Sequence, residues 1–238
     1  MGALNVLSPN RVAFPPPEAA LDNPKGLLAV GGELTPEWLM TAYTNGVFPW
    51  FEDDASPILW WCPDPRAVLR FEDLKISRSL AKRIRNGGFK ISMDAAFADV
   101  VLGCSQPRAY SDDTWITDSM MRAYIELHAM GYAHSVEIWL EEALVGGLYG
   151  VSLGRMFFGE SMFATEKDAS KVAFFHLVEQ LKAWEFTLID CQIMNDHLAS
   201  LGASSMPRED FLDLLANNRN QPTRVGNWEF DAHPGARR

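Results

Sequence analysis

Cysteine and histidine are scarce in this sequence of 238 residues, and neither follows a metal-binding or disulfide pattern. The three cysteines, Cys62, Cys104 and Cys191, are far apart, and no Cys-x-x-Cys pair occurs. The five histidines are scattered without the spacing of metal ligands. Disulfide frameworks and structural zinc sites both need closely patterned residues, so we expect a reducing compartment and no bound metal.

Segments that target or anchor a protein are also missing. The N-terminus has no basic region followed by an apolar stretch, so a signal peptide is not expected. No apolar run approaches the roughly 20 residues that span a bilayer. The formal net charge is −10, which argues against a general nucleic-acid binder. We therefore expect a soluble, cytoplasmic protein.

The residues that are present predict one large core with a smaller lobe in front of it. Hydrophobic residues make up 47% of the chain, which suffices for a core of this kind. Residues 1–66 are rich in Pro, Gly and Trp. Within them, Thr35 and Pro36 are typical of a helix start, and Asn45-Gly46 is typical of its end. We expect residues 1–66 to form a small N-terminal lobe.

Residues 67–238 alternate between strand and helix patterns. Consecutive strands at 135–140, 144–151 and 155–158 form a meander in this interpretation. A long helix at 169–184 and a further strand follow the meander. Asp94 is expected to cap a helix that runs to about residue 102. Strands grouped with helices in this way predict an α+β fold with a mixed-sheet second domain over residues 67–238.

The strand after that long helix is apolar at 186–189 and then becomes polar. Side chains two positions apart share one face of a strand, so Asp190 and Gln192 are expected to point the same way. A carboxylate and an amide at the end of a buried strand are costly unless they are hydrogen-bonded or functional. Either they satisfy a turn or they perform chemistry.

A basic segment between residues 75 and 90 contains no acidic residue. Three of its cations, Arg78, Lys82 and Arg85, are spaced to share one face of a helix. The pattern fits either a solvated helix face or a surface for a phosphate backbone, and the absence of compensating acids favours the second. The predicted backbone contacts are Lys75, Arg78, Lys82, Arg83 and Arg85.

Two tryptophans and one acid complete the candidates. Trp50 and Trp115 lie near proline or turn residues, where exposed rings can stack on nucleobases, although tryptophan is more often a core residue. Glu160 lies among Phe158, Met162 and other apolar side chains, and Phe158, Glu160 and Met162 would share a face if the strand continues. A buried acid there would suit a cationic ligand group, whereas an edge strand would leave it in solvent.

Several stretches occur together and in order over roughly residues 8 to 215: 26–32, 46–51, 58–69, 114–117, 144–151, 159–163 and 187–203. With these stretches the chain resembles the bacterial leucyl/phenylalanyl-tRNA–protein transferase family. The resemblance implies transfer of Leu, Phe or, less efficiently, Met from aminoacyl-tRNA to proteins with N-terminal Arg or Lys. This transfer marks those proteins for degradation in the N-degron (N-end rule) pathway. It also implies a GNAT-like (acyl-CoA N-acyltransferase-like) second domain.

The resemblance also implies roles for particular residues. Trp50 and Trp115 correspond to the rings that hold the terminal adenosine of the tRNA. Asp190 and Gln192 correspond to the catalytic pair, and Glu160 with Asn195 corresponds to the site for the acceptor N-terminus. Apolar residues line the pocket for the transferred side chain: Leu148, Phe157, Met162, Leu177, Leu181 and Ile189. Leu148 stands where a methionine is familiar in the family, and Leu177 and Leu181 where phenylalanines are.

Aminolysis of an activated ester needs no covalent intermediate. An amide is a very poor base, so Gln192 is expected to orient the acceptor amine, and either Asp190 or the ribose hydroxyl of the tRNA takes the proton. Residues 164–171 contain no glycine, so a backbone nest for the CoA pyrophosphate is absent and no cofactor is expected. Two alternatives remain: a CoA-dependent N-acyltransferase, and a non-catalytic RNA-binding adaptor.

Overall fold

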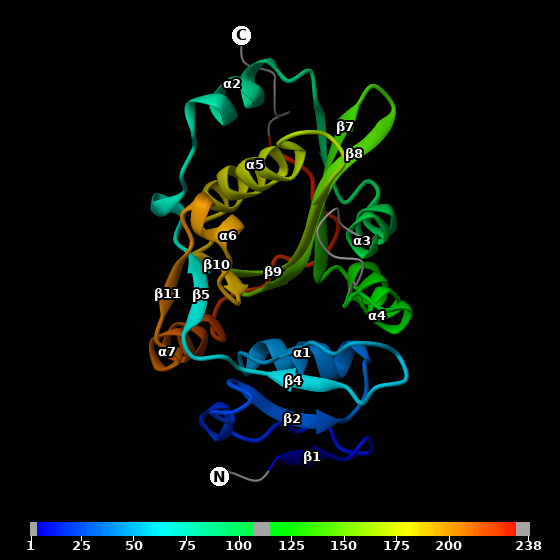
Figure 1. Cartoon of the computed structure of the whole chain (residues 1–238), viewed down its shortest axis with the longest axis vertical. Helices are drawn as coiled ribbons and strands as arrows, with labels where there is room; N and C mark the ends of the chain where they lie inside the picture. The colour runs from blue at the N-terminus through cyan, green and yellow to red at the C-terminus, as the bar shows by residue number, and fades with distance from the viewer. Residues whose placement is uncertain (1–3, 107–114, 232–238) are drawn as a thin grey trace.

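The computed structural model describes residues 4–106 and 115–231 (Figure 1). The first of its two sheets has four strands in the order β1-β2-β4-β3. Its strands are β1 (Asn5–Leu7), β2 (Leu27–Gly31), β3 (Phe48–Pro49) and β4 (Leu59–Trp61). Helix α1 (Pro36–Thr44) and a 3-10 turn (Pro17–Ala19) complete this lobe. It lies at the bottom of Figure 1, beneath the second sheet.

The second sheet has seven strands in the order β11-β5-β10-β9-β8-β7-β6. The meander of β7, β8 and β9 forms its antiparallel half, and the pairing between β9 and β10 is parallel. The strands are β5 (Arg66–Leu69), β6 (Lys90–Met93), β7 (Ala133–Leu140), β8 (Ala143–Leu153), β9 (Met156–Ala164), β10 (Leu188–Gln192) and β11 (Ser204–Met206). A mixed sheet with helices confirms the predicted α+β class.

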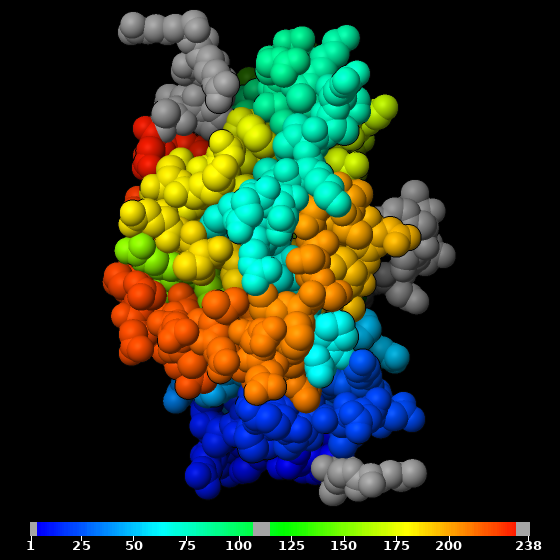
Figure 2. Space-filling view, turned by 90° about the vertical axis from the view of Figure 1, so that its left-hand side faces the viewer, coloured from blue at the N-terminus to red at the C-terminus, as the bar shows by residue number. Residues whose placement is uncertain are grey.

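Helices cover both faces of the second sheet. Helix α5 (Ala169–Ala183) packs on one face, and α3 (Phe97–Ser105) and α4 (Asp118–Ala129) pack on the other. The remaining elements are α2 (Arg78–Asn86), α6 (Asp196–Leu201), α7 (Arg208–Asn218) and a 3-10 turn (Phe71–Asp73). Figure 2 shows α7 (orange-red) between the blue small lobe and the yellow α5.

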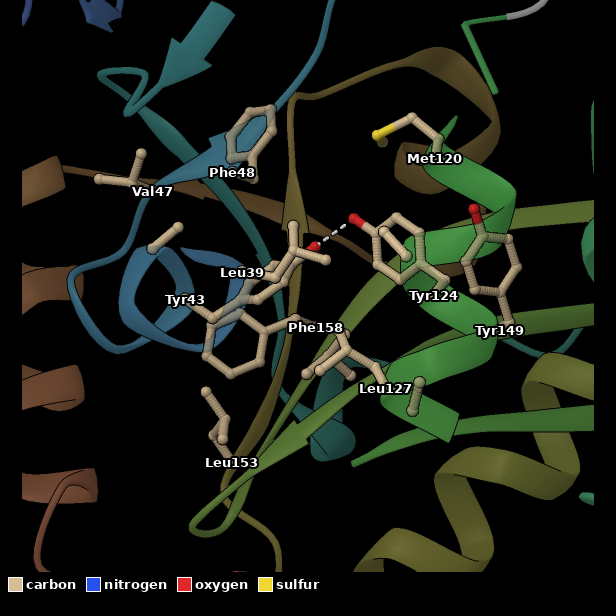
Figure 3. Packing of buried hydrophobic residues seen from close by; sticks show 14 of the residues in the cluster. Leu39, Tyr43, Val47, Phe48, Met120, Tyr124, Leu127, Tyr149, Leu153 and Phe158 are labelled. Carbon is tan, nitrogen blue, oxygen red and sulfur yellow. Dashed lines mark hydrogen bonds between the residues drawn. The ribbon is translucent and has the colours of Figure 1, made fainter. Parts of the chain in front are cut away.

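The two lobes share a core. One cluster of buried side chains joins Trp38 and Trp60 of the small lobe to Tyr124 of α4, Phe158 of β9 and Phe211 of α7. Figure 3 shows part of this cluster, with Leu39 and Tyr43 of α1 near Tyr124 and Phe158. A second cluster lies under α5 on the opposite face of the large sheet. Burying an apolar side chain is worth about 1.5–3 kcal/mol, so the first cluster fixes the small lobe against the large one.

The predicted helix start at Thr35 and Pro36 is confirmed. The side-chain oxygens of Thr35, Ser77 and Thr117 accept backbone N–H groups at the starts of α1, α2 and α4. The predicted cap at Asp94 is wrong, because α3 begins at Phe97 and the Asp94 carboxylate accepts backbone N–H groups of Ser135 and Trp228. The third meander strand also runs further than predicted, to Ala164.

Candidate functional site

The parallel strands β9 and β10 separate at the centre of the large sheet. Their described pairing runs from Leu188 and Met156 to Asp190 and Phe158. Just past this point each strand has a bulge against its other neighbour. The β8–β9 register shifts so that Glu160 is the extra residue, and the β5–β10 register shifts so that Cys191 is extra. Bulges bend a strand and re-aim its side chains, so both strands turn away from each other here.

A glycine makes the first bulge possible. A Cβ atom on Gly150 of β8 would lie 2.2 Å from the carbonyl oxygen of Phe158. A side chain at this position would therefore push β9 away from β8. The close approach of the β8 and β9 backbones at Gly150 allows the bulge that contains Glu160.

A cavity of about 940 Å³ opens where the strands part. This volume suits a small-molecule-sized group, because ligand pockets typically measure about 300–1,000 Å³. Most of the site residues predicted from the sequence line this cavity: Trp50, Trp115, Leu148, Phe157, Glu160, Met162, Leu177, Ile189, Gln192 and Asn195. These residues come from both lobes and from strands, helices and loops, so the fold brings together positions far apart in the sequence.

Leu181 is an exception among the predicted pocket residues. It is fully buried and packs in the core cluster under α5, away from the cavity lining. Leu177, which does line the cavity, lies one helical turn earlier. A turn of α-helix advances about 5.4 Å, which carries Leu181 past the end of the opening.

Asp190 does not line the cavity either. Its carboxylate is fully buried and accepts two hydrogen bonds from Arg66, at 2.8 Å from Nε and 2.6 Å from Nη2. The third donor, the Nη1 of Arg66, reaches the carbonyl oxygen of Gly46 at 2.9 Å. The guanidinium also lies over the rings of Phe48 and Phe211. Asp190 therefore ties β10 to β5 and to the small lobe.

The electrostatics of Arg66 agree with this tight pairing. Burial alone would lower the pKa of the guanidinium, but the Asp190 charge and its hydrogen bonds outweigh burial and raise that pKa. Arg66 thus stays charged. Because both partners are buried, removal of either one would leave an uncompensated charge in the core.

The predicted shared face of Asp190 and Gln192 is wrong. Gln192 has a left-handed φ of 61°, and the bulge at Cys191 lies between the two residues. The Gln192 side chain turns into the cavity, where its amide donates to Glu160 at 2.8 Å. Only its backbone N–H contacts Asp190, at 2.9 Å. Strict two-residue alternation fails here because a bulge inserts one residue into the period.

Unlike Asp190, Glu160 lines the cavity. It accepts hydrogen bonds from the hydroxyls of Tyr43 at 2.7 Å and Tyr124 at 2.9 Å, in addition to Gln192. Burial raises the pKa of Glu160 to about 7, against the lowering effect of these three donors. The residue keeps partial exposure to the cavity, so a ligand can reach it.

The predicted common face of Phe158, Glu160 and Met162 is also wrong beyond the bulge. Phe158 packs in the cluster with Tyr43 and Tyr124, whereas Met162 packs against the cluster under α5. The extra residue at Glu160 reverses the order of faces along β9. As a result Met162 joins Phe157 on the side where the apolar part of the cavity lies.

The two tryptophans lie at the small-lobe end of the cavity. Trp50 is 43% exposed and its ring packs against Trp61, while Trp115 is half-buried. Thr114, next to Trp115 in one of the matching stretches, lies outside the described residues. The Asp54 carboxylate contacts the side chain and backbone N–H of Ser119 at the start of α4. This contact holds the loop that follows Trp50 against the segment that carries Trp115.

Asn195 begins helix α6 at the rim of the cavity. Its side-chain oxygen accepts the Leu198 N–H at 2.9 Å, so it caps the helix. The oxygen has a second lone pair that can accept from an acceptor group, and the amide nitrogen can only donate.

The basic segment lies away from this cavity. Lys75, Arg78, Lys82 and Arg85 are exposed, on α2 or just before it. Arg83 differs from the others, because it is half-buried over the Phe89 ring and lies 3.8 Å from Glu166. The local sequence holds no acid, but the fold supplies one to this residue.

Sequence reasoning did not assign roles to Arg66, Tyr43 or Tyr124. Arg66 belongs to one of the matching stretches, but an arginine that follows Pro63 and Pro65 would be expected at the protein surface. The tyrosines read as ordinary helix-core positions. Their functional contact requires α1 and α4 to meet across Glu160, and no local pattern predicts that meeting.

The acidic, cysteine and histidine side chains of the described residues are dispersed, and the start of α5 carries an aspartate with a left-handed backbone. Within residues 4–106 and 115–231, histidine, cysteine and acidic side chains form no group of three or more that could hold an ion. At the start of α5, where a pyrophosphate would need backbone donors, Asp168 stands at the cap with φ 65°. None of the helices in the described residues is long and apolar enough to cross a membrane.

Comparison with known proteins matches this arrangement to a family. Residues 68–216 match the family described as leucyl/phenylalanyl-tRNA protein transferase, and residues 32–64 match its N-terminal domain. The leucyl/phenylalanyl-tRNA–protein transferase of Pseudomonas syringae pv. syringae is 54% identical over 220 residues, covering 92% of this chain and 96% of the relative. That of Hahella chejuensis is 56% identical over 202 residues, covering 85% and 86%.

Solved structures were compared as well. A GCN5-related N-acetyltransferase from Kribbella flavida aligns with a TM-score of 0.38 and 11% identity, over 71% of this chain and 60% of that protein. On the family match and the identities with its relatives, this chain belongs to the leucyl/phenylalanyl-tRNA–protein transferase family.

Proposed function

We propose that this protein transfers Leu, Phe or, less efficiently, Met from aminoacyl-tRNA to the α-amino group of proteins that begin with Arg or Lys. The observation that carries the acceptor class is Glu160, a cavity carboxylate held by two hydroxyls and one amide. A desolvated carboxylate in this setting gains most from a cationic partner. An N-terminal Arg or Lys supplies one.

The donor side of the cavity supports the aminoacyl-tRNA. Leu148, Phe157, Met162, Leu177 and Ile189 form an apolar surface for an unbranched-β side chain such as Leu or Phe. At the other end, Trp50 and Trp115 offer rings for the terminal adenosine. The exposed cations of the basic segment suit the phosphate backbone further along the tRNA.

The reaction we propose is direct aminolysis. The ester of aminoacyl-tRNA is already activated, so correct positioning of the amine supplies much of the rate enhancement, up to about 7–11 kcal/mol in favourable systems. Gln192 faces the cavity and orients the amine. The amine attacks the ester carbonyl, the new C–N bond forms and the ester C–O bond breaks. Asp190 holds Gln192 and Arg66 in place and does not touch substrate, so we assign the amine proton to the ribose oxygen of the tRNA, which leaves as a hydroxyl.

Biological consequences follow from the same proposal. Addition of Leu or Phe to the N-terminus would mark the acceptor protein for degradation by the N-degron route. Charged tRNA is a cytoplasmic substrate, so a cytoplasmic location remains our prediction.

A transfer assay tests the proposal directly. Labelled Leu-tRNA is incubated with the protein and with two acceptors that differ only in an N-terminal Arg or Glu. We expect label on the Arg acceptor and none on the Glu acceptor. No incorporation into either acceptor would overturn the proposed activity, and equal incorporation into both would overturn the acceptor class. Acetyl-CoA in place of Leu-tRNA tests the rival N-acyltransferase, which requires acetylation of the acceptor.

A further inference from the structure

Three oxygen-bearing side chains form a closed triangle beside the cavity. The Tyr43 hydroxyl lies 2.7 Å from Glu160 Oε1, and the Tyr124 hydroxyl lies 2.9 Å from Glu160 Oε2. The two hydroxyls lie 2.5 Å from each other. A dashed line marks this hydrogen bond in Figure 3. They come from α1 and α4, and the carboxylate comes from the bulge in β9.

The triangle contains more contacts than the tyrosines have hydrogens. Each of the three oxygen–oxygen contacts needs one hydrogen between its atoms, because two unprotonated oxygens at these distances repel each other. Tyr43 and Tyr124 supply one hydrogen each. The Gln192 amide donates to Oε1 separately and adds none to the triangle. The third hydrogen must come from Glu160 as a carboxylic acid.

A protonated Glu160 satisfies every contact at once. When Glu160 is ionised, the Tyr124 hydroxyl donates to Oε2. When Glu160 is protonated, this bond reverses: the Glu160 O–H donates to Tyr124, the Tyr124 hydroxyl donates to Tyr43, and the Tyr43 hydroxyl donates to Oε1. Each of the three oxygen–oxygen contacts then contains one hydrogen, and each of the three residues donates once and accepts once within the triangle. Removal of the proton breaks one link and leaves a buried negative charge.

The charged and titratable groups around the triangle agree with this arrangement. Burial, and then the Glu160 charge, raise the pKa values of Tyr43 and Tyr124, so both hydroxyls keep their hydrogens. Burial likewise raises the pKa of Glu160 to about 7. Neighbouring groups come from the other packed strands: Tyr149 of β8, Arg66 of β5, and Asp190 and Cys191 of β10. Arg66 and Asp190 offset each other as an ion pair.

We propose that Tyr43, Tyr124 and Glu160 hold one exchangeable proton in the empty cavity, and that a cationic acceptor N-terminus displaces this proton when it binds. The inference rests on the acceptor class proposed above. The Glu160 O–H bond breaks, its proton passes to solvent, and the carboxylate pairs with the incoming cation. A neutral N-terminal side chain offers no charge to replace the proton. The tyrosines therefore take part in acceptor selection.

Calorimetry measures this exchange. A dipeptide with N-terminal Arg is titrated into the protein in buffers of different ionisation enthalpy, which yields the number of protons released on binding. With a pKa of about 7, we expect release of about 0.9 proton at pH 6 and about 0.1 at pH 8. The apparent affinity for the dipeptide should be about tenfold weaker at pH 6 than at pH 8, because the proton competes with the cation for Glu160.

Two variants separate the triangle from other titrating groups. Glu160→Gln supplies the third hydrogen from a permanent amide, so its proton release should be lower than that of wild type by about 0.9 at pH 6. The α-amine of the dipeptide contributes equally to the proton release of both proteins, so its contribution cancels in this difference. Glu142→Gln removes an exposed acid in the turn between β7 and β8 and should release protons as wild type does.

A second measurement does not require the Gln variant to bind the dipeptide. Infrared difference spectra of wild type at pH 6 should show loss of a carboxylic-acid carbonyl band on addition of dipeptide. Binding without this loss, or with equal proton release in wild type and Glu160→Gln, would overturn the inference and leave the acceptor class intact. Absence of any binding to wild type would overturn both.

Discussion

Arg66 and Asp190 form a buried ion pair with two hydrogen bonds, at 2.8 and 2.6 Å, that joins β5 to β10. The pair lies directly behind the cavity, and Gln192 is hydrogen-bonded to it through its backbone N–H. It replaces the predicted picture of Asp190 as a side chain that faces substrate. In the structure the Asp190 side chain lies outside the cavity lining, whereas Gln192 and Glu160 line the cavity.

The buried pair makes a prediction about stability. Arg66→Met and Asp190→Asn should each lower the free energy of unfolding by about 3–5 kcal/mol, because each leaves a buried charge unpaired. The double variant should lose less than the sum. Denaturant unfolding measures these differences. Arg155→Met, which removes the exposed pair with Glu185, is the control and should cost at most about 1 kcal/mol. Strict additivity of the two buried substitutions would contradict the pairing.

The role of Asp190 in proton transfer is tested by the pH dependence of the rate. Asp190→Asn should transfer Leu more slowly in single-turnover assays, because Gln192 is less well held, but the shape of its pH profile should match wild type. The single-turnover rates should be measured at a temperature well below the melting temperature of the variant. If the rate of the variant no longer rises with pH where that of wild type does, Asp190 is the proton acceptor after all.

The tryptophan pair predicts an effect on tRNA binding. Trp50→Ala or Trp115→Ala should raise KM for aminoacyl-tRNA by about tenfold, since stacking on a base is worth about 1–3 kcal/mol. Trp50→Phe keeps an aromatic ring and should recover most of the loss. Steady-state kinetics with saturating acceptor give these values. A KM for Trp50→Ala equal to that of wild type would return this ring to a packing role.

The basic segment predicts a change in salt dependence. Lys82→Glu together with Arg85→Glu should raise KM for aminoacyl-tRNA more than it changes kcat, and should reduce the slope of log affinity against log salt by about one for each lost phosphate contact. Arg83→Met is the matched control. It removes a cation that already lies near Glu166 and over Phe89, so its slope should change less. Equal slopes for all variants would indicate a solvated helix face.

The apolar end of the cavity predicts a change in side-chain preference. Leu177→Phe adds volume to the cavity lining and should shift the ratio of transferred residues from Phe toward Leu, in competition between the two charged tRNAs. Leu181→Phe is the matched control one turn away, outside the lining. It should lower stability by about 1–3 kcal/mol through overpacking and leave the ratio unchanged. A changed ratio in Leu181→Phe would place that residue in the pocket.

Much of the local structure followed from the sequence because its causes are local. Thr35, Ser77 and Thr117 cap helices with hydrogen bonds that span only three residues. Strand β10 ends in polar residues, as its composition indicates. Asp94 failed as a predicted cap because its carboxylate found partners 41 and 134 residues away.

The candidate site divides in the same way. Residue types and motifs were enough to select most of the cavity residues, although not to exclude Asp190 and Leu181, since apolar, aromatic and acidic side chains of these kinds suit an aminoacyl group, a base and a cation. The sequence by itself determined the α+β class, the family resemblance and the chemical inventory of the site. Only the tertiary structure decided that Glu160 lines the cavity and that Asp190 does not, because that choice depends on two bulges, on Arg66 paired with Asp190, and on α1 and α4 meeting at Glu160. The side-chain contacts of Glu160 and Asp190 with Tyr43, Tyr124 and Arg66 join positions more than thirty residues apart, and no local pattern specifies them.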